Sequence, residues 1–142
     1  MAAQSVAQSQ TQSQSDSPTL LRRALLANSI FSALSGLFFL LGAAPISAFL
    51  GLDMPMMIRF LGVDLLIFGA IVYKVATASP INRTFATVIV ALDVVWVIGS
   101  IALIFGNIVP LTTGGKWAIA IVADVVTCFA IAQYMGIRRM KK

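Results

Sequence analysis

Long apolar runs separated by short polar stretches make up the chain after residue 19. Each run approaches the ~20 residues that a helix needs to cross the ~30 Å hydrocarbon core of a bilayer. A helix also bonds every backbone amide within its own segment, as lipid requires. Because the connections are short, neighbouring helices should run antiparallel. The pattern predicts an all-α, four-helix transmembrane bundle of up-down-up-down topology, with spans over residues 24–44, 56–78, 85–105 and 117–135.

Residues 1–19 form a different segment, rich in Gln and Ser and without a large apolar side chain beyond Val6. Such a composition buries too little apolar surface to offset the entropy lost on ordering. We therefore expect a disordered cytoplasmic tail, followed by a transmembrane domain over residues 20–142.

The connection after the first run is longer than a tight turn and mostly apolar. Its central part, "ISAFLGL" at residues 46–52, has two interpretations. One is a short amphipathic turn that lies along the membrane interface with Asp53 facing water. The other is an ordinary loop.

The overall composition supports the membrane assignment. Hydrophobic residues make up 59% of the chain and charged residues 11%, and the mean hydropathy is +0.95. A soluble domain is about half apolar and about a quarter charged. This chain lacks the polar surface that water requires, so the lipid bilayer is its expected partner.

Missing residue types exclude several kinds of function. The chain contains no His and no Glu, and Cys128 is its only cysteine. This argues against His/Cys metal sites, disulfide frameworks and His-based nucleophilic catalysis. We therefore expect no enzyme, no metal and no cofactor. The net charge of +5 comes from basic residues at the ends of the apolar runs, which argues against a nucleic-acid partner.

The basic residues also predict an orientation. Arg59 and Lys116 fall on one side of the predicted bundle, and the other side, which carries both termini, has eight. By the positive-inside rule both termini are cytoplasmic, in a multi-pass protein of the cell inner (plasma) membrane. A cleaved signal peptide ending near "GAAPISA" is the alternative, but the first run exceeds the about 7–15 residues of a signal core. The eight are Arg22, Arg23, Lys74, Arg83, Arg138, Arg139, Lys141 and Lys142.

Three of the predicted spans carry a single acid each, namely Asp64, Asp93 and Asp124. By helical rise, Asp64 and Asp124 lie ~12 Å below the outer boundary and Asp93 ~13 Å above the inner one. An aspartate at the centre of a membrane helix costs about 2.5–3.5 kcal/mol on insertion scales. We therefore expect all three carboxyl groups to point into the bundle and to share a layer near its midplane.

Partners for these acids are scarce in the middle of the spans. The nearest cation is Arg59, a possible charge partner for an acid on a neighbouring helix. Three close carboxylates cannot all be ionised without a cation, so at least one or two should carry a proton or hold a bound cation. Polar side chains that share the predicted core are Asn28, Ser32 and Ser35 on one face of the first span, with Trp96 and Thr127 on later spans.

Two functions are consistent with a polar layer of this kind. Intramembrane acids often mark a pathway, so the protein is interpreted as a small transporter or a proton- or cation-handling protein that uses the buried aspartates. The alternative is a non-catalytic membrane subunit, or an assembly or scaffold protein, whose polar residues fix helix packing. A third interpretation is an oligomer interface, in which the acids meet partners in a homodimer or on another membrane protein.

Four sequence stretches give the chain a resemblance to an uncharacterised group of small four-span bacterial membrane proteins, which implies no known activity. The similarity to DoxX-like proteins is one of architecture only. Small multidrug exporters carry an essential glutamate in their first span, where this chain has Ser32 and Ser35 and no acid. The stretches are "ANSIFSALSG" (27–36), "LGL" (50–52), "VALDVVWVIGS" (90–100) and "GIRR" (136–139).

Overall fold

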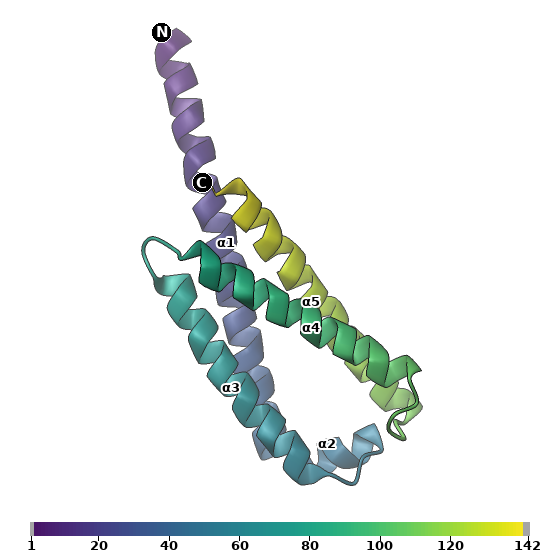
Figure 1. The fold of residues 1–142 in the computed structure, drawn as a ribbon. Coiled ribbons are helices and arrows are strands. Elements are labelled where there is room, and N and C mark those ends of the chain that lie inside the picture. The colour runs from purple at the N-terminus through teal and green to yellow at the C-terminus, as the bar shows by residue number, and fades with distance from the viewer. Residues whose placement is uncertain (1, 141–142) are drawn as a thin grey trace.

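A computed structural model describes the backbone of residues 2–140 and the side chains of residues 2–5 and 19–140. Within that part of the chain, four helices are long and apolar enough to cross a membrane, the first of them over Thr19–Leu41. The prediction of an all-α protein with four apolar helices packed as a bundle is therefore confirmed (Figure 1). The helices are α1 (Ala2–Leu41), α2 (Ala43–Leu50), α3 (Pro55–Thr77), α4 (Arg83–Phe105) and α5 (Thr113–Arg139).

The first and last predicted spans differ from the structure at both ends, and in the structure they begin at Thr19 and Thr113. The first span ends at Leu41, because Gly42 separates α1 from α2 and Pro45 lies in the first turn of α2. The last span continues through Gly136 to Arg139. Gly136 does not end the helix but lets it approach α1, since a Cβ added there would lie 2.8 Å from the Leu21 Cβ.

Polar groups at the helix ends explain where several elements begin and end. The Asn82 Oδ1 accepts hydrogen bonds from two amides in the first turn of α4, at 2.9 and 3.2 Å, and the Thr112 Oγ1 accepts one from the Gly115 amide of α5 at 2.9 Å. Such caps satisfy amides that have no partner within the helix. At the end of α3, the Arg22 guanidinium donates to the carbonyls of Ala76 and Ala78 at 2.6 and 3.1 Å.

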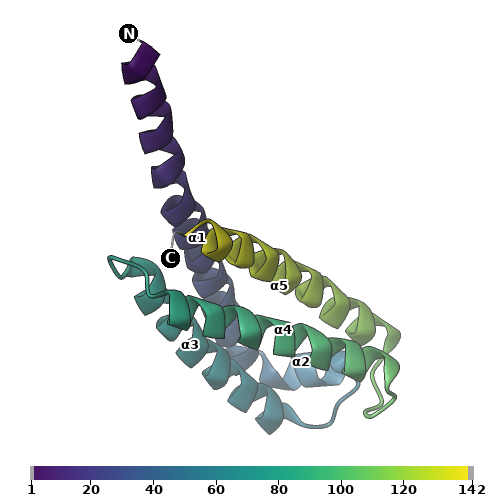
Figure 2. The same ribbon diagram turned by 45° about the horizontal axis from the view of Figure 1, so that its top comes forward.

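The four long helices stand at the corners of a square. Helix α1 packs between α3 and α5, while α4 packs along α5 and barely touches α3 (Figures 1 and 2). Among the described residues, the backbones of α1 and α4 do not come into contact. These two helices therefore occupy opposite corners, and only side chains that reach across the centre connect them.

Helices α1 and α3 meet backbone to backbone along a seam of small residues. A Cβ added at Gly36 would lie 2.7 Å from the Gly62 carbonyl oxygen, and one at Gly62 would lie 2.7 Å from the Gly36 carbonyl oxygen. Two turns further along, the Ser29 hydroxyl donates to the Gly69 carbonyl at 2.9 Å. Small residues permit this close approach between membrane helices.

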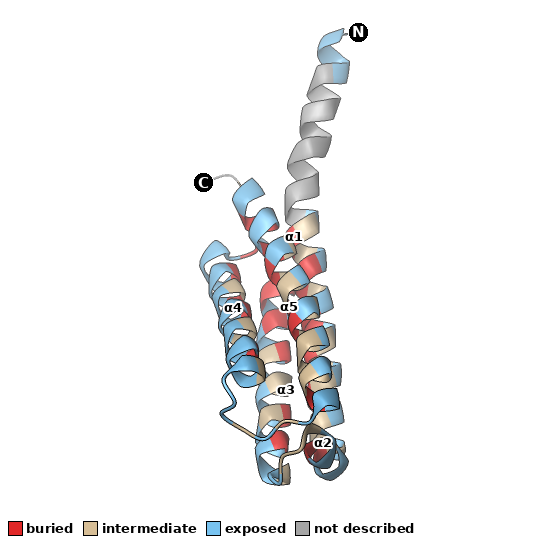
Figure 3. Ribbon diagram, turned by 90° about the vertical axis from the view of Figure 1, so that its right-hand side faces the viewer, coloured by how far each residue is buried: buried red, intermediate tan, exposed pale blue. Residues whose placement is uncertain are grey.

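The apolar core lies toward the end of the bundle that carries Arg22. Its nine buried members come from α1, α3, α4, α5 and the connection before α4: Leu21, Leu25, Val72, Val75, Ala76, Ile81, Ala86, Ile89 and Ile137. The outward faces of the long helices are exposed, with residues such as Leu34, Phe60, Val95 and Ile121 (Figure 3). A water-soluble monomer rarely exposes apolar surface on this scale, so these faces suit a lipid environment.

Helix α2 and the nearby connections close the opposite end. Helix α2 occupies much of the segment predicted as an interfacial turn, Gly51 follows it with a left-handed φ of 83°, and Asp53 is exposed. The Thr112 amide donates to the Leu50 carbonyl at 3.0 Å, which joins α2 to the start of α5. Whether α2 lies along a membrane interface stays a prediction.

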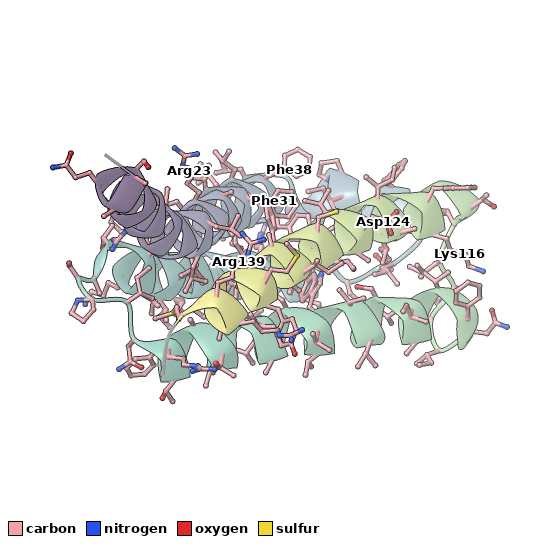
Figure 4. The ribbon with its side chains drawn as sticks, turned by 90° about the horizontal axis from the view of Figure 1, so that it is seen from above. Arg23, Phe31, Phe38, Lys116, Asp124 and Arg139 are labelled. Carbon is pink, nitrogen blue, oxygen red and sulfur yellow. The ribbon has the colours of Figure 1, made fainter. Side chains whose placement is uncertain are left out.

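The basic side chains gather at one end of the bundle, as the sequence predicts. Arg23 and Arg139 lie toward one end and Lys116 lies at the other (Figure 4). The side of the membrane on which each end lies stays a prediction from the positive-inside rule. The backbone of residues 2–18 belongs to helix α1, where the sequence predicts a disordered tail, and the side chains of residues 6–18 lie outside the described residues.

Candidate functional site

Asp93 lies near the middle of α4 and is 4% exposed. Its Oδ2 accepts a hydrogen bond from the Asn28 Nδ2 of α1 at 2.8 Å and a second from the Gln133 Nε2 of α5 at 3.3 Å. The carboxyl group therefore links three helices at the centre of the bundle. Its bond to Asn28 spans the diagonal between α1 and α4.

Asn28 is itself held in place by its own helix. The Ser32 hydroxyl, one turn later, donates to the Asn28 Oδ1 at 3.2 Å, and both side chains are buried. With its carbonyl oxygen occupied by Ser32, the Asn28 amide nitrogen is directed to Asp93. We call Asn28, Ser32, Asp93 and Gln133 the Asp93 cluster.

Gln133 is the member that sequence reasoning missed. It is 0% exposed, and its Oε1 is fully buried without a hydrogen-bond partner among the described residues. The signal was available, because Gln133 is the only glutamine after the N-terminal tail. It also lies seven residues after Val126 and three after Ala130, both of them buried, and helical spacing puts all three on one face.

The prediction that all three acids point into the bundle is wrong for Asp64 and Asp124, both of which are exposed. The depth of a residue along a helix does not determine the direction in which its side chain points around the helix axis. Asp64 follows Gly62 by two residues, or about 200° of helical rotation, and Gly62 faces α1. Asp124 is next to the buried Ala123, about 100° away from it. Only Asp93 belongs to the central cluster.

The remaining predicted site residues lie outside the Asp93 cluster. Ser35 and Trp96 are half-buried, and the Trp96 carbonyl accepts a bond from Ser100 at 2.9 Å. The Thr127 hydroxyl donates to the Ala123 carbonyl of its own helix at 2.7 Å. Arg59 is exposed, and its Nη1 lies 3.6 Å from the Met56 Sδ, so the structure does not pair it with an acid.

Two acceptor oxygens of the cluster receive no hydrogen bond. Asp93 Oδ2 accepts both amide bonds, whereas Asp93 Oδ1 accepts none from the described residues and Gln133 Oε1 is buried without a partner. The donors that surround Asp93 are neutral, and no Lys or Arg of the described residues bonds to it. Buried polar atoms without partners are costly. A positively charged or proton-donating group would balance the set.

A multidentate metal site does not fit this cluster. Within the described residues, no group of three or more His, Cys, Asp or Glu side chains gathers anywhere. Divalent Ca²⁺ takes about 6–8 oxygen ligands, far more than one carboxylate and one amide carbonyl provide. The chemistry open to the cluster is the binding of a proton or of a small cation.

A search of known protein families finds no model that matches the chain, and searches of curated proteins and of solved structures find no match either. The resemblance to small four-span bacterial proteins therefore stays a prediction. The same holds for a homodimer or another membrane protein as a partner.

Proposed function

We propose that this integral membrane protein is a small transporter or a proton- or cation-handling protein, with Asp93 as the group that takes up and releases the ion. The observation that carries the proposal is the pair of acceptor oxygens in the Asp93 cluster, Asp93 Oδ1 and Gln133 Oε1, that receive no hydrogen bond from the described residues. A buried carboxyl group faces only neutral donors, beside an amide oxygen that has no partner among the described residues.

Electrostatics favours this function over a purely inert core. An isolated carboxylate in an apolar interior is strongly disfavoured unless it is paired, protonated or bound to a cation. Intramembrane acids that face a bundle interior commonly mark ion or proton pathways. Asp93 meets both conditions, since it is buried inside the bundle and has no basic partner among the residues described. No catalytic reaction is part of the proposal.

Purified protein in liposomes loaded with a pH-sensitive dye tests the proposal. Under an inward proton gradient, with potassium and valinomycin to compensate charge, the wild type should take up protons faster than protein-free liposomes. Asp93→Asn should reduce uptake to the protein-free rate. The Asn side chain keeps the shape and supplies an amide donor for the Gln133 Oε1, so the fold should survive, which circular dichroism checks.

Asp124→Asn is the matched control, because it removes an exposed acid from α5 at the bundle surface. It should leave uptake at the wild-type rate. The same liposomes with sodium- or potassium-sensitive dyes extend the measurement to other cations. A folded Asp93→Asn protein that transports at the wild-type rate in every assay would overturn the proposal.

A second function is favoured by a different observation. The backbones of α1 and α4 do not touch, and the bond between Asn28 and Asp93 bridges them. Polar side chains of this kind hold membrane helices in register, as in a non-catalytic membrane subunit or an assembly or scaffold protein. Wild-type liposomes that carry no proton or cation flux above the protein-free rate would favour this function.

A further inference from the structure

Two oxygens of the Asp93 cluster receive no hydrogen bond from the described residues. Both hydrogen bonds to the Asp93 carboxyl end on Oδ2, from the Asn28 Nδ2 at 2.8 Å and from the Gln133 Nε2 at 3.3 Å. Among the described residues, Oδ1 accepts no hydrogen bond. The Gln133 Oε1 is buried without a partner in the same part of the chain. Oδ1 belongs to the Asp93 carboxyl group and Oε1 belongs to the Gln133 side-chain amide. These two groups already share the hydrogen bond from Nε2 to Oδ2.

The shared bond joins the carboxyl group of Asp93 to the side-chain amide of Gln133 and leaves one oxygen of each group without a partner among the described residues. A carboxylic acid and a primary amide can join through two bonds, one from the amide N–H to the acid carbonyl and one from the acid O–H to the amide carbonyl. Gln133 already makes the first of these bonds to Asp93. A single proton on Asp93 Oδ1 would complete the second, and it would give both unpartnered oxygens a role.

We propose that the ion taken up by this site is a single proton, held on Asp93 Oδ1 and donated to Gln133 Oε1. This inference rests on the proposed function and names its ligand. A larger ion fits less well, because the four cluster members are each at most 4% exposed. A proton needs no space beyond the hydrogen bond that it forms.

The surroundings contain no other titratable group bonded to Asp93. From α1 it meets Asn28, and from α5 it meets Gln133, and both are neutral. The other ionisable side chains of α5's apolar part, Asp124, Cys128 and Tyr134, are exposed, as is Asp64 on α3. The protonation of Asp93 therefore changes the bonding between α4 and α5 directly. With the proton, two bonds join these helices, and without it one bond and a repulsive pair of oxygens remain.

Infrared difference spectroscopy of the full-length protein in liposomes tests this inference. At neutral pH the wild type should show the carbonyl stretch of a protonated carboxyl group, and the band should be absent in Asp93→Asn. Gln133→Met has a similar shape but neither the donor nor the acceptor. It should shift the band to higher frequency, since the acid loses two hydrogen bonds. Thr127→Val is the control on α5, because the Thr127 hydroxyl bonds only to its own backbone, and it should leave the band in place.

A second measurement follows the Gln133 carbonyl itself, with Asp93→Asn as its control. Wild-type protein labelled with ¹³C at the glutamine side-chain carbonyl should show a shifted labelled band when alkaline pH removes the proton from Asp93. The shift should be missing in labelled Asp93→Asn. A labelled band that does not respond to pH, or an acid band unchanged in Gln133→Met, would overturn the acid–amide pair.

The failures of the two proposals are distinguishable. If Asp93→Asn abolishes cation flux but no protonated carboxyl band is lost with Asp93, the site handles another cation and the proton inference is wrong. If the band is present and responds to Gln133→Met while flux is unaffected by Asp93→Asn, the acid–amide pair stands and the transport proposal is wrong.

Discussion

Gly62→Leu is expected to separate α1 from α3 and to destabilise the bundle by about 3 kcal/mol or more. A Cβ at this position would lie 2.7 Å from the Gly36 carbonyl oxygen and 2.8 Å from the Leu40 amide nitrogen. Both are backbone atoms, so no side-chain rotation relieves the contact, and the helices must move apart. Their separation also weakens the Ser29–Gly69 hydrogen bond. The measurement is unfolding by increasing SDS in mild detergent, followed by circular dichroism.

Gly99→Leu is the matched control for this substitution. Gly99 also lies inside a long apolar helix, but nothing lies within 4 Å of an added Cβ there. Leucine has a better helix propensity than glycine by up to about 1 kcal/mol, so Gly99→Leu should be neutral or slightly stabilising. Equal effects of the two substitutions would contradict the close α1–α3 contact.

Asn28→Leu is expected to destabilise the bundle by about 1–3 kcal/mol, because it removes the shorter of the two hydrogen bonds to a buried carboxyl group. It also removes the acceptor of the Ser32 hydroxyl. Leucine has a similar volume and suits an apolar helix, so packing and propensity should change little. The same SDS unfolding experiment measures the loss.

Two further variants isolate the Asn28–Asp93 contact. Ser35→Ala alters another polar residue of α1, which is half-buried and lies outside the Asp93 cluster. Its free energy of unfolding should stay within about 0.5 kcal/mol of the wild-type value. In the Asn28→Leu/Asp93→Leu double variant no unpaired carboxyl remains. The double variant should lose less unfolding free energy than the sum of the losses of Asn28→Leu and Asp93→Leu, by about 1 kcal/mol or more. Additive losses would mean that the two side chains do not interact.

The sequence was sufficient to predict the bundle, because the length and hydropathy of a span are properties of the segment itself. The two middle helices begin and end within two residues of their predicted bounds. The errors occurred where a residue acts through a neighbouring helix. Gly136 resembles a helix terminator in sequence, but it lies inside α5 because Leu21 of α1 packs against it.

The site was predicted only in part for the same reason. Asn28 and Ser32 were identified because a spacing of four residues puts them on one face of a helix. The depths of the three acids were also comparable, but depth does not say which neighbour each helix face meets. That depends on packing, which turns Asp93 inward and leaves Asp64 and Asp124 exposed.

Gln133 was not predicted as a member of the site, although it bonds to Asp93. Asn28 was singled out because it shares a helix face with two serines, whereas Gln133 has no polar neighbour at helical spacing on its own helix face. Its importance follows from the 3.3 Å contact with a residue 40 positions earlier in the chain. Only the packed structure supplies that contact.

The central claim is that a single carboxyl group at the centre of the bundle, and not a ring of three, carries the site. The most direct test is the initial rate of dye-reported proton uptake into liposomes by the Asp64→Asn/Asp124→Asn double variant, in which Asp93 is the only acid left within the four candidate membrane spans. We predict uptake at the wild-type rate, against the protein-free rate for Asp93→Asn. Uptake by the double variant that falls to the level of Asp93→Asn would contradict the account.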